Sequence, residues 1–207
     1  MTKTETLTDH DTYVYTIRDS LYINLGNNCT LTCDFCPKHN GTWMVHDYDM
    51  SLEKPPTATM VIDAINDPKQ YNEIVFCGYG EPTLRLKPLL EIATWVKAKG
   101  GRVRVNTDGL GNLANKRNIL PELSKCVDAL SISLNAQDEE TYNLHCKPGL
   151  KGSWEAMLAF SQEATKWIDE VSVSAINGLE GVDIPKCKQL AEKMGVHFKE
   201  RFMDVVG

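Results

Sequence analysis

Short apolar runs rich in β-branched residues alternate with longer amphipathic stretches along most of the chain. Glycine, proline or polar turn residues bound each run, a pattern typical of buried strands joined by helices. Six runs predict the strands of a parallel sheet, at residues 21–25, 73–77, 102–106, 129–133, 171–175 and 196–201.

Amphipathic stretches predict the helices between these strands, at residues 57–66, 87–99, 115–125, 152–167 and 184–194. Pro56 precedes the first, and Gly195 follows the last, as is usual at helix ends. Residues 12–17 alternate like a further strand, and the polar residues 18–20 suit a turn. We therefore expect an N-terminal extension over residues 1–20 that ends in a β-hairpin.

Six β/α units predict an α/β fold, but they are too few for a closed eight-fold barrel, which takes about 250 residues. A partial barrel and a doubly wound sheet both fit 207 residues. Both architectures place active-site loops at the carboxyl ends of the strands. The length predicts one domain over residues 1–207.

The composition of the chain limits the kinds of partner that the protein can bind. The net charge of −6 argues against a dedicated nucleic-acid surface or an anionic-membrane surface. No stretch approaches the roughly 20 apolar residues of a membrane span. The polar, acidic N-terminus does not resemble a signal peptide, so we expect a cytoplasmic location. Seven cysteines, an odd number, then favour metal or redox chemistry over disulfides.

Three of the cysteines follow the first predicted strand. Cys29, Cys33 and Cys36 have the spacing C-x3-C-x2-C. Thiolates select zinc, copper(I) or iron–sulfur clusters. His39 or His46 could complete a Cys3His zinc site in a non-catalytic interaction module. A cubane held by only three cysteines would instead leave one iron open.

Polar or glycine-rich residues follow the other strands as well. The second strand leads into Gly78–Pro82, the third into Thr107, the fourth into Asn135 and the fifth into Asn177. Their recurrence at one edge of the sheet predicts a ligand site there.

The cysteine motif with Phe35 before its last member resembles the C-x3-C-x-aromatic-C signature of the radical S-adenosylmethionine (SAM) superfamily. The resemblance implies a [4Fe–4S] cluster whose open iron binds the amino and carboxylate groups of SAM. It also implies reductive cleavage of SAM to a 5′-deoxyadenosyl radical that abstracts hydrogen from a substrate. The implied fold is a partial (β/α)6 TIM-like barrel, which agrees with the six strands and which we adopt, together with the short N-terminal β-hairpin.

The resemblance also implies which residues contact SAM. The stretch from Tyr79 to Pro82 is similar to the Gly-Gly-Glu-Pro motif, with Tyr79 replacing the first glycine, and Glu81 with nearby backbone would hold the amino group. The fifth-strand motif is only partly matched, at Ile176 and Gly178. The implied SAM contacts are Phe35, Tyr79, Gly80, Glu81, Pro82, Asn106, Thr107, Ser133, Asn135 and Ile176.

Across the chain, sequence segments such as CDFCPK and IVFCGYGEPTLRL resemble those of small radical SAM proteins associated with TatD-type hydrolases. This implies an oxygen-sensitive enzyme of unknown substrate, a one-electron reductant such as flavodoxin or ferredoxin, and a TatD-type hydrolase as partner. The 7-carboxy-7-deazaguanine synthases are similarly compact and provide the alternative within the superfamily.

The other four cysteines form no second tight group, so we expect no auxiliary cluster. Cys126 and Cys187 lie in predicted helices and suit the core. Cys146 is predicted to lie in the loop region after the fourth strand, on the rim. It is a candidate for hydrogen-atom donation or substrate contact, with His145 beside it, and packing is the alternative.

Overall fold

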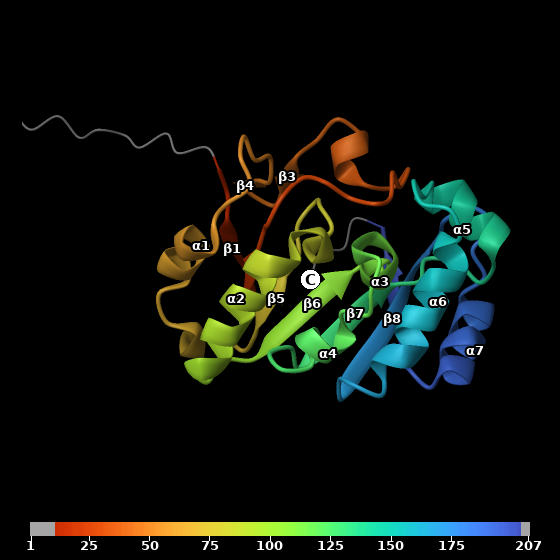
Figure 1. Cartoon of the computed structure of the whole chain (residues 1–207). Coiled ribbons are helices and arrows are strands. Elements are labelled where there is room, and N and C mark those ends of the chain that lie inside the picture. The colour runs from red at the N-terminus through yellow and green to blue at the C-terminus, as the bar shows by residue number, and fades with distance from the viewer. Residues whose placement is uncertain (1–10, 204–207) are drawn as a thin grey trace, which may run out of the picture.

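A seven-stranded sheet forms the centre of the computed structural model, which describes residues 11–203 (Figure 1). The strands are β1 (Val14–Ile17), β2 (Ser20–Ile23), β5 (Ile74–Phe76), β6 (Val103–Thr107), β7 (Ala129–Ser133), β8 (Glu170–Asn177) and β9 (His197–Phe202). Their order in space follows the chain. Strands β1 and β2 pair antiparallel, and every later pair is parallel.

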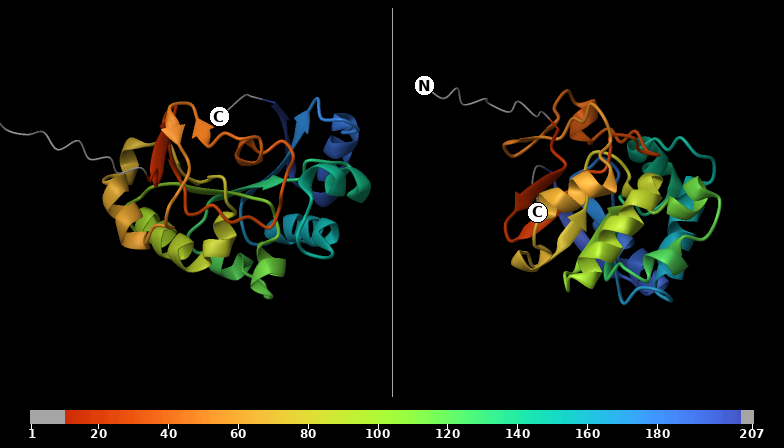
Figure 2. Two further views of the ribbon diagram at one scale, coloured as in Figure 1. Left: turned by 90° about the horizontal axis from the view of Figure 1, so that it is seen from above. Right: turned by 60° about the vertical axis from the view of Figure 1, so that its left-hand side comes forward.

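Helices cover the outer face of this curved sheet, while β1 and β9 form its two ends (Figure 2). The helices are α1 (Ala58–Ile65), α2 (Leu86–Ala98), α3 (Gly111–Asn115), α4 (Leu120–Leu123), α5 (Glu139–Cys146), α6 (Ser153–Ala164) and α7 (Ile184–Met194). A mostly parallel sheet with helices on one face confirms the expected α/β, partial-barrel class.

All six predicted strands are present, and the predicted hairpin is confirmed because β1 pairs with β2 with Tyr15 opposite Tyr22. Residues 1–10 of the predicted N-terminal extension lie outside the described residues. The single helix predicted at 115–125 was wrong. The chain forms two short helices instead, because Lys116 takes a left-handed conformation after α3 and Pro121 lies in the first turn of α4.

Helix α5 was missed, so the prediction that Cys146 lies in a loop was wrong. Asp138 caps the helix by accepting a hydrogen bond from the Thr141 N–H, and Glu139 and Glu140 lie in its first turn. Both features stabilise a helix N-terminus. Cys146 is its last residue, before Lys147 takes a left-handed conformation.

The main hydrophobic core lies between the sheet and the helices. Along β6, Val103 and Val105 are buried in this core, whereas Arg104 and Asn106 point to the opposite, inner face of the sheet. A second, smaller core at the β1 end of the inner face contains Tyr15, Tyr22, Met50 and Val75, among others. The inner face is therefore apolar near β1 and polar further along.

The long connection over residues 39–55 contains two short paired strands, β3 (Met44–Val45) and β4 (Tyr48–Asp49). Met50 anchors this segment in the smaller core. The Tyr79 hydroxyl donates a 2.8 Å hydrogen bond to the Met44 carbonyl, and its ring lies 5.9 Å from that of Trp43. The segment is thus fastened to the loop that follows β5.

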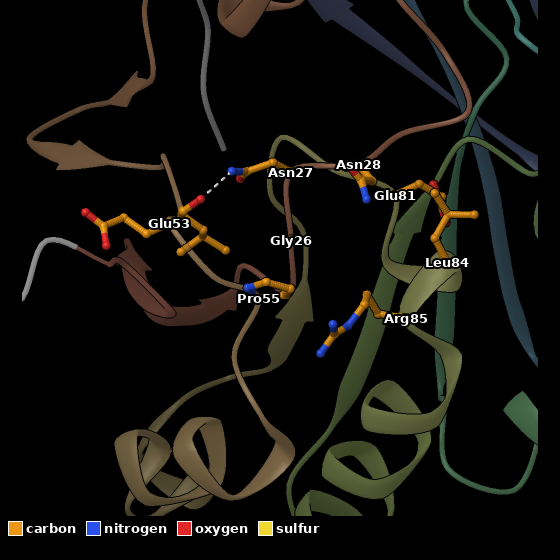
Figure 3. A pocket seen from close by; sticks show the side chains of 9 residues that line it. Gly26, Asn27, Asn28, Glu53, Pro55, Glu81, Leu84 and Arg85 are labelled. Atoms are coloured by element: carbon orange, nitrogen blue, oxygen red, sulfur yellow. Dashed lines mark hydrogen bonds between the residues drawn. The ribbon is translucent and has the colours of Figure 1, made fainter.

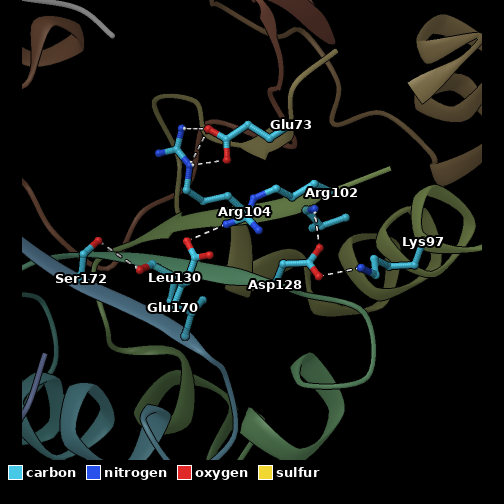
Figure 4. Close-up of polar contacts among 9 residues, drawn as sticks. Glu73, Lys97, Arg102, Arg104, Asp128, Leu130, Glu170 and Ser172 are labelled. Atoms are coloured by element: carbon cyan, nitrogen blue, oxygen red, sulfur yellow. Dashed lines mark hydrogen bonds and ion pairs between the residues drawn. The ribbon is translucent and has the colours of Figure 1, made fainter. Parts of the chain in front are cut away.

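Ion pairs join residues near the amino ends of the strands (Figure 4). Arg104 holds both carboxylate oxygens of Glu73, while Arg102 pairs with Glu170. Lys97 of α2 pairs with Asp128 just before β7. Between residues 11 and 203, no helix combines the length and apolar character needed to cross a bilayer.

Candidate functional site

The cysteine loop runs from the end of β2 across the carboxyl edge of the sheet. Cys29, Cys33 and Cys36 are all free and partly buried. The Cys36 N–H donates to the Cys33 carbonyl at 3.2 Å, which forms a turn between these two cysteines. Lys38 then closes the loop by donating hydrogen bonds to the carbonyls of Asn27 (3.0 Å) and Tyr79 (2.8 Å).

Burial raises the pKa of all three thiols in the metal-free protein. Desolvation, with the nearby Asp108 carboxylate second, raises the pKa of Cys29 to about 12. A side-chain hydrogen bond with Cys146 is the largest cause of the raised pKa of Cys33, and burial is the main cause for Cys36. Metal binding at these thiols must therefore release protons.

A single metal ion and an iron–sulfur cluster place different requirements on the three thiols. In the part of the chain from 11 to 203, no three His, Cys, Asp or Glu side chains lie close enough to hold one metal ion. A structural zinc ion needs such a group. The three free, partly buried thiols supply the thiolate ligands that an iron–sulfur cluster requires.

Glu81 connects the loops after β5 and β6. It is buried, and its Oε1 accepts hydrogen bonds from the Thr83 N–H (2.9 Å), the Thr83 hydroxyl (2.6 Å) and the Thr107 hydroxyl (2.7 Å). Its Oε2 accepts from the Asp108 N–H at 2.8 Å. Burial, and secondly Asp108, raise the pKa of Glu81 to about 8.

Asp108 extends this connection to the cysteine loop. Its Oδ2 accepts a hydrogen bond from the Thr30 hydroxyl and lies 3.9 Å from the Cys29 sulfur. Its Oδ1 accepts from the Leu110 N–H at 2.9 Å. No sequence pattern predicts a role for Thr30 or Asp108, because only the fold brings them together.

Gly80 lies directly against the backbone of the cysteine loop. A Cβ atom at this position would be 2.2 Å from the Gly26 carbonyl oxygen and 2.7 Å from that of Asn28. The Glu81 N–H also donates to the Asn28 carbonyl at 2.8 Å. The glycine is therefore required for close backbone approach rather than for an unusual φ angle.

Register places several implied SAM contacts on the inner face of the sheet. Asn106 pairs with Ser131, Ser133 with Ser174, and Ile176 with Arg201, so each pair shares a face. Thr107 points to the other face and is buried against Glu81. The structure thus brings Asn106, Ser133 and Ile176 onto one surface and gives Thr107 a structural role.

The remaining implied contacts surround the cysteine loop. Phe35 packs against the main core, and Pro82 is buried at the start of a short 3-10 helix. Tyr79 holds the 39–55 segment through its hydroxyl and Lys38 through its carbonyl. Asn135 is 1% exposed and lies beside Cys146.

Arg201 lies on the inner face beside Asn135, and no sequence motif predicts a role for it. Its Nη2 donates a 2.9 Å hydrogen bond to Asn135 Oδ1, and its Nε is buried with no hydrogen-bond partner in the described part of the chain. Burial lowers the pKa of Arg201. Its position in the last predicted strand, where an arginine would face the inner side of the sheet, was the signal from which a ligand contact could have been predicted. An unpaired buried guanidinium N–H suits an anionic ligand.

His145 contacts the cysteine loop through Asp34 and the loop after β8 through Glu180. It is 6% exposed, and its Nδ1 lies 3.1 Å from Asp34 Oδ2. Its Nε2 is 2.7 Å from the Glu180 carbonyl, which can only accept, so Nε2 donates. His145 therefore connects the cysteine loop to the loop after β8.

A cavity of about 270 Å³ borders the start of the cysteine loop (Figure 3). Asn27, Asn28, Glu81 and Arg85 are among its lining residues. Asn27 Oδ1 and Arg85 Nε are buried without protein partners in the described residues. These polar atoms make the cavity suitable for ordered water.

The Radical SAM superfamily profile matches residues 23–194. A search of curated proteins finds no match. Among solved structures, TYW1 with a bound lysine-pyruvate adduct has a TM-score of 0.63 at 19% identity, over 91% of this chain and 66% of that one. SuiB from Streptococcus suis bound to S-adenosylmethionine has a TM-score of 0.67 at 12% identity, and the match covers 92% of this chain and 42% of SuiB.

Native anSMEcpe with bound AdoMet gives a TM-score of 0.59 at 16% identity, over 88% of this chain and 50% of that one. The chain spans less than two thirds of the length of each of these three proteins. At these identities the likeness concerns the fold. With the family match over most of its length, the chain belongs to the radical SAM superfamily, whose members are enzymes that use a [4Fe–4S] cluster and S-adenosylmethionine.

Proposed function

We propose that Cys29, Cys33 and Cys36 hold a [4Fe–4S] cluster with one open iron, and that the protein cleaves SAM reductively. The observation that carries the proposal is the position of the three free thiols on one loop at the carboxyl edge of the sheet. Soft thiolates are the ligands that such clusters require. When bound, the cluster and SAM would together supply a 5′-deoxyadenosyl radical for hydrogen abstraction from a substrate.

The chain's own residues would then position SAM and exclude water. Asn106 and Ser133 offer an amide and a hydroxyl from the inner face of the sheet, and Arg201 offers a buried N–H suited to a carboxylate. The Glu81 carboxylate already accepts four internal hydrogen bonds. We therefore propose that Glu81 supports the rim, while neighbouring backbone receives the amino group of SAM.

The zinc-module alternative is disfavoured on two grounds. The family match is to a class of enzymes. A structural zinc site also has no use for Glu81 and Thr107, which meet where the loops after β5 and β6 adjoin.

Reduction of the cluster requires a one-electron donor, and we propose flavodoxin or ferredoxin in this role. A cytoplasmic location would suit this chemistry, because thiols stay reduced there. The association with a TatD-type hydrolase and sensitivity to oxygen stay predictions from the sequence resemblance.

The test is anaerobic reconstitution with iron and sulfide, followed by an assay of 5′-deoxyadenosine in the presence of dithionite and SAM. We expect wild-type protein to form it slowly without substrate, and C29A, C33A and C36A to lose both the cluster and the product. C126A and C187A are matched controls, since both cysteines are buried in the main core. Product from C33A would contradict the proposal.

A further inference from the structure

A fourth cysteine lies beside the cysteine loop. Cys146 ends α5 and is completely buried. The carbonyls of His145 and Cys146 accept hydrogen bonds from the Asp34 and Thr32 N–H groups, both at 3.0 Å. These two bonds flank Cys33 and bring it beside Cys146, whose thiol is the largest influence on the raised pKa of Cys33.

The orientation of the Asn135 amide is determined by its neighbours. Arg201 can only donate hydrogen bonds, so the atom 2.9 Å from its Nη2 must be Asn135 Oδ1. The Asn135 Nδ2 consequently faces the Cys146 sulfur, at 3.4 Å, and donates to it. Asn135 has a φ of 62°, in the left-handed region, and its N–H is held by the Ser174 carbonyl.

This arrangement determines which of the two neighbouring thiols can donate a hydrogen bond to the other. The Cys146 sulfur receives the Asn135 N–H, which leaves its own S–H free to point at Cys33. A Cys33 thiolate that binds iron has no proton to donate, so it can only accept. Cys146 is then the donor. Arg201 orients the Asn135 amide, and that amide in turn donates to the Cys146 sulfur.

We propose that Cys146 is a positioning residue whose S–H donates a hydrogen bond to the cluster-bound sulfur of Cys33. The inference rests on the proposed function, because it assumes the cluster. Hydrogen bonds to ligand sulfurs stabilise the more negative, reduced state and so raise the reduction potential. Cys146 thereby makes the cluster easier to reduce. This role differs from hydrogen-atom donation, because the proton stays on Cys146.

The test is the midpoint potential of the reconstituted cluster, followed by EPR during a redox titration. A serine hydroxyl is a stronger donor than a thiol, so the expected order is C146A below wild type and C146S above it. C187A, another buried free cysteine, should match wild type. A C146S potential equal to that of wild type would overturn the inference, whether or not C146A retains iron.

The two proposals fail in different ways. If reconstituted wild-type protein contains no iron–sulfur cluster, the proposed function is wrong. If the cluster forms but C146A, C146S and wild type share one potential, only the role of Cys146 is wrong. R201Q gives a further measurement, because loss of the guanidinium frees the Asn135 amide and should lower the potential in the same direction as C146A.

Discussion

The backbone N–H of Asp108 donates a 2.8 Å hydrogen bond to Oε2 of Glu81, which joins the loop after β6 to the loop after β5. Both side chains are buried. Asp108 also accepts from the Thr30 hydroxyl, so the same pair reaches the cysteine loop. The two acids thus support the rim that carries the cluster ligands.

Replacing Glu81 by alanine should destabilise the fold. The Thr83 and Asp108 N–H groups and two threonine hydroxyls would lose their acceptor inside the protein. Unsatisfied buried donors cost about 1–3 kcal/mol each, so we expect E81A to lose at least about 3 kcal/mol of unfolding free energy. Urea unfolding of the reduced, metal-free protein measures this difference in unfolding free energy between E81A and wild type. E91A, on the exposed side of α2, should change it by less than about 0.5 kcal/mol.

The stability of the metal-free protein should fall as the pH rises from 5 to 8. The pKa of Glu81 is raised to about 8 in the folded protein, chiefly by burial. In this window the folded state keeps a proton that the unfolded chain releases, so unfolding is favoured at higher pH, by at most about 1.4 kcal/mol per pH unit. E81Q cannot titrate and should show a flatter dependence. Parallel curves for wild type and E81Q would contradict the assignment.

Much of the fold could be predicted because strands and helices here follow local rules. The alternation of β-branched runs and amphipathic stretches located all six core strands. Helix α5 was missed because EETYNLHC has few apolar residues at helical spacing, although Asp138 before two glutamates was a usable capping signal. The break between α3 and α4 was signalled by Pro121.

The site was only partly predictable, for a different reason. The spacing of the three cysteines is local, so it could be recognised in the sequence. The contacts of Cys33 with Cys146 and of Thr30 with Asp108 join residues far apart in the chain. No periodicity reports such pairs, and only the fold brings them together.

Gly80 should not tolerate a side chain. In G80A the new methyl group would meet the carbonyl oxygens of Gly26 and Asn28, which are backbone atoms and cannot rotate away. Overpacking of this kind costs about 1–3 kcal/mol, which corresponds to a fall in Tm of several degrees. We expect G80A to show this fall and a reduced iron content after reconstitution. G149A, where a Cβ would lie 3.4 Å from its nearest neighbour, should behave like wild type.

His145 should control how firmly the cluster is held. H145A removes the connection between Asp34 in the cysteine loop and the Glu180 carbonyl. Loss of an outer-shell partner typically weakens metal binding by about 10-fold or more. We therefore expect faster iron loss from H145A in the presence of a chelator, followed by the decay of its visible absorbance. H197A, on the exposed part of β9, is the control, and equal decay rates would argue against this role.

The most direct measurement of the central claim is the EPR spectrum of the anaerobically reconstituted, dithionite-reduced protein with and without SAM. Three cysteine ligands leave one iron open, so we predict a reduced [4Fe–4S] signal that shifts when SAM is added. A colourless protein without iron and sulfide, or a cluster signal unchanged by SAM, would contradict the account.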